Sequence, residues 1–115
     1  MNPPGFRVEA VDYAHRRDDL LRVRETVFVR EQHVPLEEER DALDPLCRHV
    51  LARDDAGQPI GTGRLTPEHR IGRMAVLREW RGRGVGDALL AALIAQARLQ
   101  RWPELTLNAQ VSAES

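Results

Sequence analysis

Residues 81–86, Arg-Gly-Arg-Gly-Val-Gly, stand between an apolar extended stretch and a long apolar helical pattern. A glycine-rich turn that enters a helix presents unpaired backbone N–H groups at the positive end of the helix dipole. Glycine lets the main chain approach an anion closely, because no Cβ atom intervenes. The two arginines add fork-shaped donors suited to pyrophosphate. The segment predicts a phosphate-binding loop; the alternative interpretation is an exposed turn that is rich in glycine and arginine.

The periodicity of the apolar residues predicts the order strand, helix, three strands, helix, strand. Alternation predicts strands at 6–11, 49–53, 60–65, 71–77 and 105–111, and helical spacing predicts helices from Asp18 or Asp19 to Gln32 and from about 84 to 101. The last helix joins two strands as a βαβ crossover, so we expect those two strands to be parallel. The chain is therefore expected to be one α/β domain, 1–115, with a mixed, mostly antiparallel sheet and flanking helices.

Composition narrows the classes of function. The 17 basic residues are all arginine and the formal net charge is −1, so lysine chemistry is excluded and no basic face for nucleic acid is evident. The single cysteine, Cys47, excludes an intrachain disulfide, and the four histidines lack metal-ligand spacing. No apolar run reaches the roughly 18 residues of a membrane span. We expect a cytoplasmic chain without metal, nucleic-acid or membrane partners.

The segment 36–45 carries five acidic residues and ends at Pro45. It is predicted to be a short helix or an irregular loop. A run of charge is usually a solvated face, and this is the structural interpretation of the segment. The functional interpretation is that it attracts a cationic substrate.

Two well-known phosphate loops do not fit the segment 81–86. A nucleoside-triphosphate loop requires a lysine, which the chain lacks. A dinucleotide loop requires a third glycine where Leu89 stands. What remains is the spacing Arg81-x-x-Gly84-x-Gly86, directly after the predicted strand 71–77.

This spacing resembles the coenzyme A signature of the GCN5-related N-acetyltransferase (GNAT) family. The match runs from Arg73 to Gly86, and the block from Val27 to Pro35, followed by Asp41, Asp44 and His49, is similar to the ElaA-type branch of that family. The resemblance covers roughly residues 6–113 and implies the acyl-CoA N-acyltransferase fold. It also implies acetyl-CoA as cosubstrate and a small-molecule or peptide amine as acceptor.

The resemblance assigns roles to particular positions. The backbone of Met74 and Val76 is expected to pair with the pantetheine arm, and the N–H of Val76 to polarise the thioester carbonyl. The expected cofactor-binding residues are Met74, Ala75, Val76, Arg81, Gly82, Arg83, Gly84, Val85 and Gly86. The side chains of Arg81 and Arg83 either contact phosphate or are solvated. Expected residues on the acceptor side are Phe28, Glu31, Gln32 and Asn108.

The general base is not identified by the sequence. Some family members carry a glutamate as general base at the position of Arg70, so this chain lacks that base. The remaining candidates are Glu31, Asp41, Asp44 and His49. The only tyrosine, Tyr13, lies far from the position of the acid that protonates the departing thiolate in the family.

Family members continue past the fifth strand with a helix and two strands, and we expect this chain to lack them. A truncated product, a second chain that completes the sheet as a homodimer at the edge of the fifth strand, or an exchanged segment would each explain this. Two functions follow from the sequence. One is an acetyl-CoA-dependent N-acetyltransferase; the other is a truncated module that binds coenzyme A or a protein partner without turnover.

Overall fold

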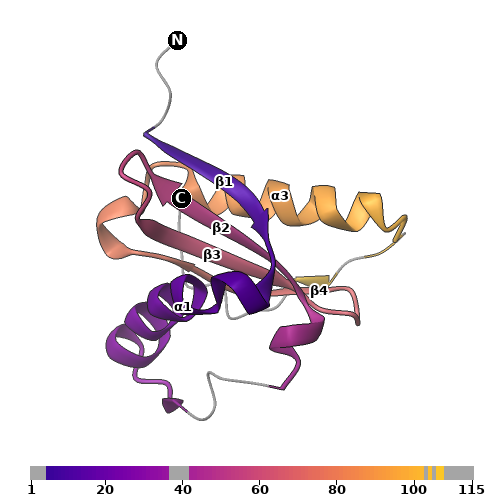
Figure 1. Cartoon of the computed structure of the whole chain (residues 1–115), viewed down its shortest axis with the longest axis horizontal. Helices are drawn as coiled ribbons and strands as arrows, with labels where there is room; N and C mark the ends of the chain where they lie inside the picture. The colour runs from indigo at the N-terminus through magenta and orange to yellow at the C-terminus, as the bar shows by residue number, and fades with distance from the viewer. Residues whose placement is uncertain (1–4, 37–41, 103, 105, 108–115) are drawn as a thin grey trace.

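The computed structural model describes residues 5–36, 42–102, 104 and 106–107 (Figure 1). The elements, in chain order, are β1 Phe6–Val11, α1 Tyr13–Arg24, the π-helix η1 Glu25–Glu31, the 3₁₀ helix η2 Asp44–Leu46, β2 Arg48–Asp54, β3 Pro59–Leu65, β4 Arg70–Val76, the 3₁₀ helix η3 Arg78–Trp80, α3 Val85–Leu99 and β5 Thr106–Leu107. No helix among these residues is long and apolar enough to cross a membrane.

The strands form one sheet in the order β1-β2-β3-β4-β5. The first four strands pair antiparallel, and β5 pairs parallel to the start of β4 through Thr106 and Leu107. The predicted mixed, mostly antiparallel sheet and the parallel crossover are therefore confirmed. The remainder of the predicted fifth strand lies outside the described residues.

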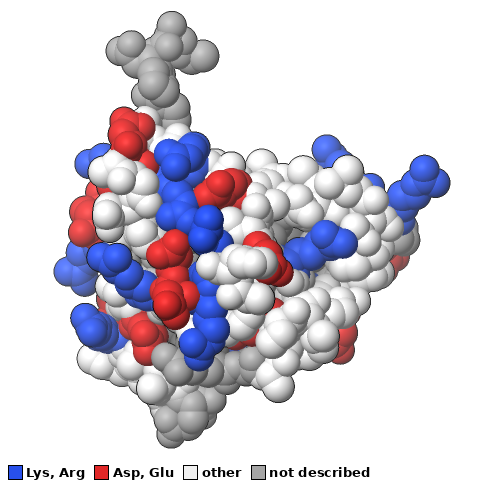
Figure 2. Space-filling model, in the orientation of Figure 1, with Lys and Arg blue, Asp and Glu red and all other residues white. Residues whose placement is uncertain are grey.

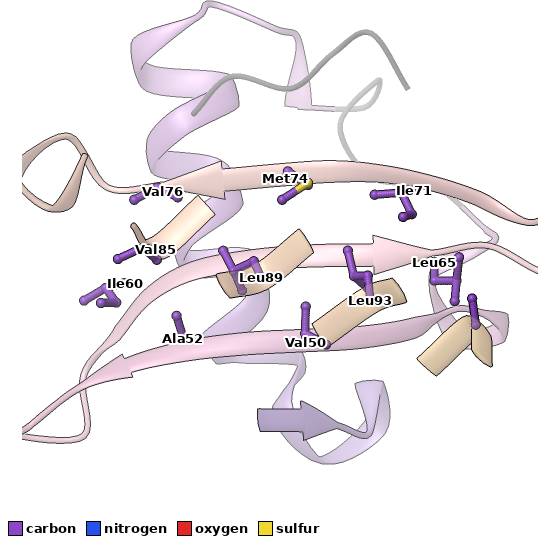
Figure 3. Close-up of a cluster of buried hydrophobic side chains, with 11 residues drawn as sticks. Val50, Ala52, Ile60, Leu65, Ile71, Met74, Val76, Val85, Leu89 and Leu93 are labelled. Atoms are coloured by element: carbon purple, nitrogen blue, oxygen red, sulfur yellow. The ribbon is translucent and has the colours of Figure 1, made fainter. Parts of the chain in front are cut away.

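Helices α1 and α3 cover opposite faces of the sheet (Figure 1). Alternate residues of a strand face opposite sides, so the strands contribute side chains to the packing under both helices. The α3 face holds an apolar cluster, drawn in Figure 3, in which Leu89 and Leu93 lie over the middle strands. Helix α3 approaches β3 closely, since a Cβ atom added at Gly63 would lie 2.8 Å from Cδ1 of Leu93. Such a side chain would displace the helix or the leucine, so glycine at this position permits the close contact.

Helix α1 opens with a turn that was not predicted, which starts at Tyr13 after an extended Asp12. Arg16, with a φ of −121° and a ψ of 18°, interrupts the helix, and its continuous part begins beside the predicted start at Asp18 or Asp19. The carbonyl of Asp12 accepts the first backbone hydrogen bonds of the helix from His15 and Arg16. The Tyr13 ring also lies 5.1 Å from the ring of His49 in β2, a contact between positions that are distant in sequence. The early helical turn is therefore stabilised by tertiary contacts.

A β-bulge interrupts β4 in its middle. Two steps along β3, from Thr62 to Arg64, oppose three steps along β4, from Ala75 to Gly72. Arg73, inside this interval, has a φ of 50°, which is uncommon for a residue other than glycine. Bulges are over-represented beside active sites, where they redirect a strand. Apolar alternation carries no signal for this bulge.

Candidate functional site

The second half of β4 has a backbone edge that faces away from β3. The Leu77 amide donates to the Ile60 carbonyl, which makes these two residues a hydrogen-bonded antiparallel pair. The backbone groups of the preceding residue, Val76, must then point away from β3. Among the described residues, β5 pairs only with Arg70 and Ile71 on that side. The N–H of Val76 therefore faces a side of the sheet on which no described strand pairs with it.

The predicted phosphate loop lies directly beyond this edge. Gly82 and Gly84 have φ values of 75° and 84°, and a Cβ atom added at either would meet nothing within 4 Å. Gly84 is the N-cap of α3, so the first-turn amides of the helix, beginning at Val85 and Gly86, have no acceptor within the helix. A left-handed backbone, open space and unpaired amides are the features that an anion site at a helix N-terminus requires.

The Arg81 side chain folds back from the loop onto the sheet. Its Nε donates to the Val76 carbonyl at 3.0 Å, and its NH1 lies 2.7 Å from Oε2 of Glu31. Its remaining nitrogen, NH2, is buried and has no hydrogen-bond partner among the described residues. The side chain is therefore not simply solvated, and two of its three nitrogens contact protein groups.

Arg83 and Asp87 behave differently from Arg81. The Arg83 guanidinium lies 4.7 Å from the centroid of the Trp80 ring, a cation–π geometry. Trp80 in turn makes an edge contact with Phe6 of β1, at 6.3 Å between centroids. Asp87 lies in the first turn of α3, where a negative charge is favourable to the helix dipole. These contacts give the loop a rigid base.

The four expected acceptor-side residues differ in their surroundings. Phe28 is buried in a cluster with Val23, Val27 and Ala75 on the α1 face. Glu31 ends the π-helix η1, and the hydrogen bond from Arg81 holds the pKa of its carboxyl below the usual value, against the opposing effect of burial. Gln32 is exposed. Asn108 lies outside the described residues.

Two of the other candidate bases, Asp44 and His49, belong to a separate cluster. Asp44 is 1% exposed and accepts hydrogen bonds from both terminal nitrogens of Arg24, at 3.0 and 3.1 Å, and from Arg64 at 2.9 Å. Burial alone would raise the pKa of Asp44, but the hydrogen bonds and charges of the two arginines outweigh it and lower that pKa. The solvated-face interpretation of the acidic segment is therefore wrong for Asp44. Its partners each lie twenty positions away in sequence, so the charge run itself gave no sign of burial.

His49 belongs to the same cluster. Its Nε2 lies 2.8 Å from the backbone carbonyl of Asp44, and burial lowers its pKa. In the sheet register, His49 pairs with Arg64, near the start of β4, whereas the loop 81–86 follows the end of β4. Gly72, the partner of Arg64 in β4, lies four residues before Val76, the last residue of β4, which corresponds to about 13 Å along an extended strand. The structure therefore separates Asp44 and His49 from the loop, and Asp41 lies outside the described residues.

A cavity of about 550 Å³ lies between the outer surface of α1 and the turn that follows β4. Both signs of charge line it, with Arg22 and Arg30 on one side and Glu79 on the other. Figure 2 likewise shows arginines and acidic residues interleaved on this face, with no extended area of a single sign. In the part of the chain that is described, no group of three His, Cys, Asp or Glu residues is arranged to hold a metal ion.

Sequence reasoning found the loop and the β4 segment but not the contacts between elements. The bulge at Arg73, the Arg81–Glu31 ion pair and the buried Asp44 cluster were all missed. One signal was available, because Arg24 falls within the apolar stripe of the first helix, between Val23 and Val27. An arginine in such a stripe indicates a buried charge that requires a partner.

Comparison with known proteins agrees with this architecture. A model of the acetyltransferase (GNAT) family matches residues 13–114. The chain is 39% identical over 98 residues to the uncharacterized N-acetyltransferase YjcF of Bacillus subtilis. This match covers 83% of this chain and 69% of that protein. Across three curated relatives the chain spans 69%, 54% and 65% of their lengths.

Solved structures with this fold include an acyl-CoA N-acyltransferase from Pseudomonas aeruginosa. It has a TM-score of 0.71 and 29% identity, over 89% of this chain and 76% of that one. Escherichia coli ElaA has a TM-score of 0.73 at 23% identity, over 89% of this chain and 75% of that one, and supports the fold alone. The chain has the acyl-CoA N-acyltransferase fold. It belongs to the acetyltransferase (GNAT) family, a family of acyltransferase enzymes.

Proposed function

We propose that this chain carries the coenzyme-binding part of an acetyl-CoA-dependent N-acetyltransferase that transfers an acetyl group to an amine. The observation that carries the proposal is the loop 81–86 at the N-terminus of α3, where Gly82 and Gly84 are left-handed and open, directly beyond the edge of β4 that faces away from β3. The buried NH2 of Arg81, which has no partner among the described residues, adds an unused donor next to this loop. Along the chain, the backbone groups of β4 that suit an extended amide arm are thus followed by the loop amides that suit a diphosphate.

The residues of β4 and the loop divide the binding between them. The Arg81 amide donates to the Arg78 carbonyl, so the amides from Gly82 to Gly86 would hold the pyrophosphate, with Arg83 stacked on Trp80 as support. Backbone groups of Met74 and Val76 would pair with the pantetheine arm as an added strand does. Ala75 and Val85 are fully buried, in the clusters under α1 and α3 respectively.

The chemistry of acyl transfer adds one requirement. Acetyl-CoA supplies an acyl thioester, and the N–H of Val76 would donate to its carbonyl oxygen as negative charge develops there. An alkyl amine has a pKa near 10 and must lose a proton before it attacks. Glu31 is the described candidate base nearest to the loop, through its contact with Arg81. Its lowered pKa makes it a poor proton acceptor while that contact persists.

Calorimetry with acetyl-CoA and with free acetate tests binding. We expect heat of binding for the coenzyme and none for acetate. Thiol release across a panel of amines then tests turnover. Coenzyme-selective binding without thiol release would favour the binding module, and absence of selective binding would contradict the proposal.

Gly84→Val and Gly57→Val form a matched pair for these assays. Both glycines have a φ of 84°, and neither has a neighbour within 4 Å of an added Cβ. The two substitutions therefore impose similar backbone strain at different places. We expect only Gly84→Val to abolish coenzyme binding, because it alone fills the loop. Equal losses in both variants would mean that strain, and not the loop, is being measured.

A further inference from the structure

One guanidinium group joins the predicted cofactor loop to the predicted acceptor side. Arg81 opens the loop, and its NH1 lies 2.7 Å from Oε2 of Glu31 at the end of η1. Each side chain of this pair is 23% exposed, so the pair is accessible from the surface. Phe28, one turn earlier in η1, is buried and anchors this end of the helix to β4. Glu31 is therefore held at a fixed place by its helix and by one arginine.

The Arg81 side chain is incompletely satisfied where it lies. Its NH2 is buried without a partner among the described residues, and a buried donor without a partner is unfavourable. A diphosphate bound to the amides of residues 82–86 would offer several anionic oxygens close to the same residue. Arginine forms forked hydrogen bonds to phosphate as well as to carboxylate. Arg81 thus has two competing anionic partners, only one of which is part of the chain.

Release of Arg81 would change the character of Glu31. With Arg81 in contact, the negative charge of Glu31 is neutralised, and the hydrogen bond lowers the pKa of its carboxyl. Arg78 is the other cation whose charge reaches this carboxyl. Without Arg81, a partly exposed carboxylate would stand beside the end of β4. Such a group attracts an ammonium ion, the form in which an alkyl amine arrives at neutral pH.

We propose that Glu31 is the residue that recognises a cationic amine acceptor, and that Arg81 masks it until a diphosphate occupies the loop of residues 81–86. This inference rests on the function proposed above, and it names the group that recognises the charge of the acceptor and the group that controls access to it. Bound coenzyme draws Arg81 toward its phosphates. The amine then binds the exposed Glu31. Glu31 acts here as a specificity-determining residue.

Side-chain NMR during a titration with coenzyme A tests the exchange of partners. The signals are the Glu31 carboxyl carbon, assigned with Glu31→Gln, and the Arg81 Nε–H. We expect both to shift, with the pKa of Glu31 rising toward its usual value, as the amides of residues 82–86 become saturated. Saturation of these amides with both side-chain signals unmoved overturns the inference and leaves the proposed function intact. Absence of binding overturns both.

The variant Glu31→Gln provides a second test, because it should strengthen the binding of coenzyme A and weaken the use of cationic amines. Freed from its ion pair, Arg81 should bind coenzyme A about fivefold more tightly, a change typical of a partly exposed pair. The kcat/KM for benzylamine and spermidine should fall about tenfold, whereas that for aniline, neutral at pH 7, should change little. The matched control is Glu68→Gln, at an exposed loop position. Weakening of both coenzyme and amine binding would indicate a merely structural role and overturn the inference.

Discussion

The face of the sheet that α3 covers and the face that α1 covers are stabilised by different interactions. Under α3 the contacts are apolar, and Leu93 lies against the backbone at Gly63. Under α1 the chain buries Asp44 between Arg24 and Arg64. Apolar contacts depend on shape and tolerate small adjustments, whereas a buried charge depends on every partner being present. The comparison indicates that the α3 face supports the cofactor loop and that the α1 face fixes η2, through Asp44, in front of β2.

The largest expected effect is on the charged face. Asp44→Ala leaves two arginines buried without their shared carboxylate, which should lower the free energy of unfolding by about 3–5 kcal/mol. Urea denaturation followed by circular dichroism measures this change. Asp55→Ala, at an exposed turn position, is the matched control and should change stability little. A loss below about 1 kcal/mol for Asp44→Ala would mean that the cluster is not a structural requirement.

A somewhat smaller effect is expected on the apolar face. Leu93→Ala removes a fully buried side chain and should cost about 3 kcal/mol, including the cavity that it leaves. Leu99→Ala, in the same helix but with a 73% exposed leucine, should cost little. Thermal unfolding of the two variants provides the measurement. Similar losses in both would contradict the placement of α3.

Gly63→Ala sharpens the comparison further. The added methyl group would lie 2.8 Å from Leu93 Cδ1 and should cost about 1–2 kcal/mol through overpacking. In the double variant Gly63→Ala/Leu93→Ala the methyl group occupies space that the leucine has vacated. The combined loss, measured by urea denaturation, should therefore be smaller than the sum of the single losses. Strict additivity would show that the two positions do not touch.

The smallest expected effect is a pH dependence that belongs to the charged face. Burial lowers the pKa of His49 from 6.5, so the unfolded chain binds more protons than the folded chain below that pH. The stabilisation is fully present above pH 6.5 and declines as the pH falls toward the lowered pKa. His49→Gln should flatten this slope between pH 7 and pH 5, and exposed His33→Gln should not. An unchanged slope in His49→Gln would assign the pH dependence to other groups.

Local patterns were sufficient to predict most of the fold. Strands β1 to β4 and helix α3 follow from alternation and helical spacing, because each has one face toward a core. The turn that precedes the kink at Arg16 was not predicted, since the contact of Tyr13 with His49 joins positions that are distant in sequence. The loop 81–86 was predictable because glycine spacing is itself local. The Glu31–Arg81 and Asp44–Arg64 pairs were not, since both join residues that only the folded chain brings together.

The cofactor loop is tested most directly by a backbone-amide NMR titration with coenzyme A and, separately, with pantetheine, which lacks the diphosphate. Coenzyme A should shift the amides of Gly82, Gly84 and Gly86 and should saturate them at a concentration at least about tenfold lower than pantetheine, because charge-assisted hydrogen bonds to phosphate are lost in the smaller molecule. Equal potency of the two compounds, or shifts centred on residues far from the loop, would contradict the assignment of residues 81–86 as the diphosphate site.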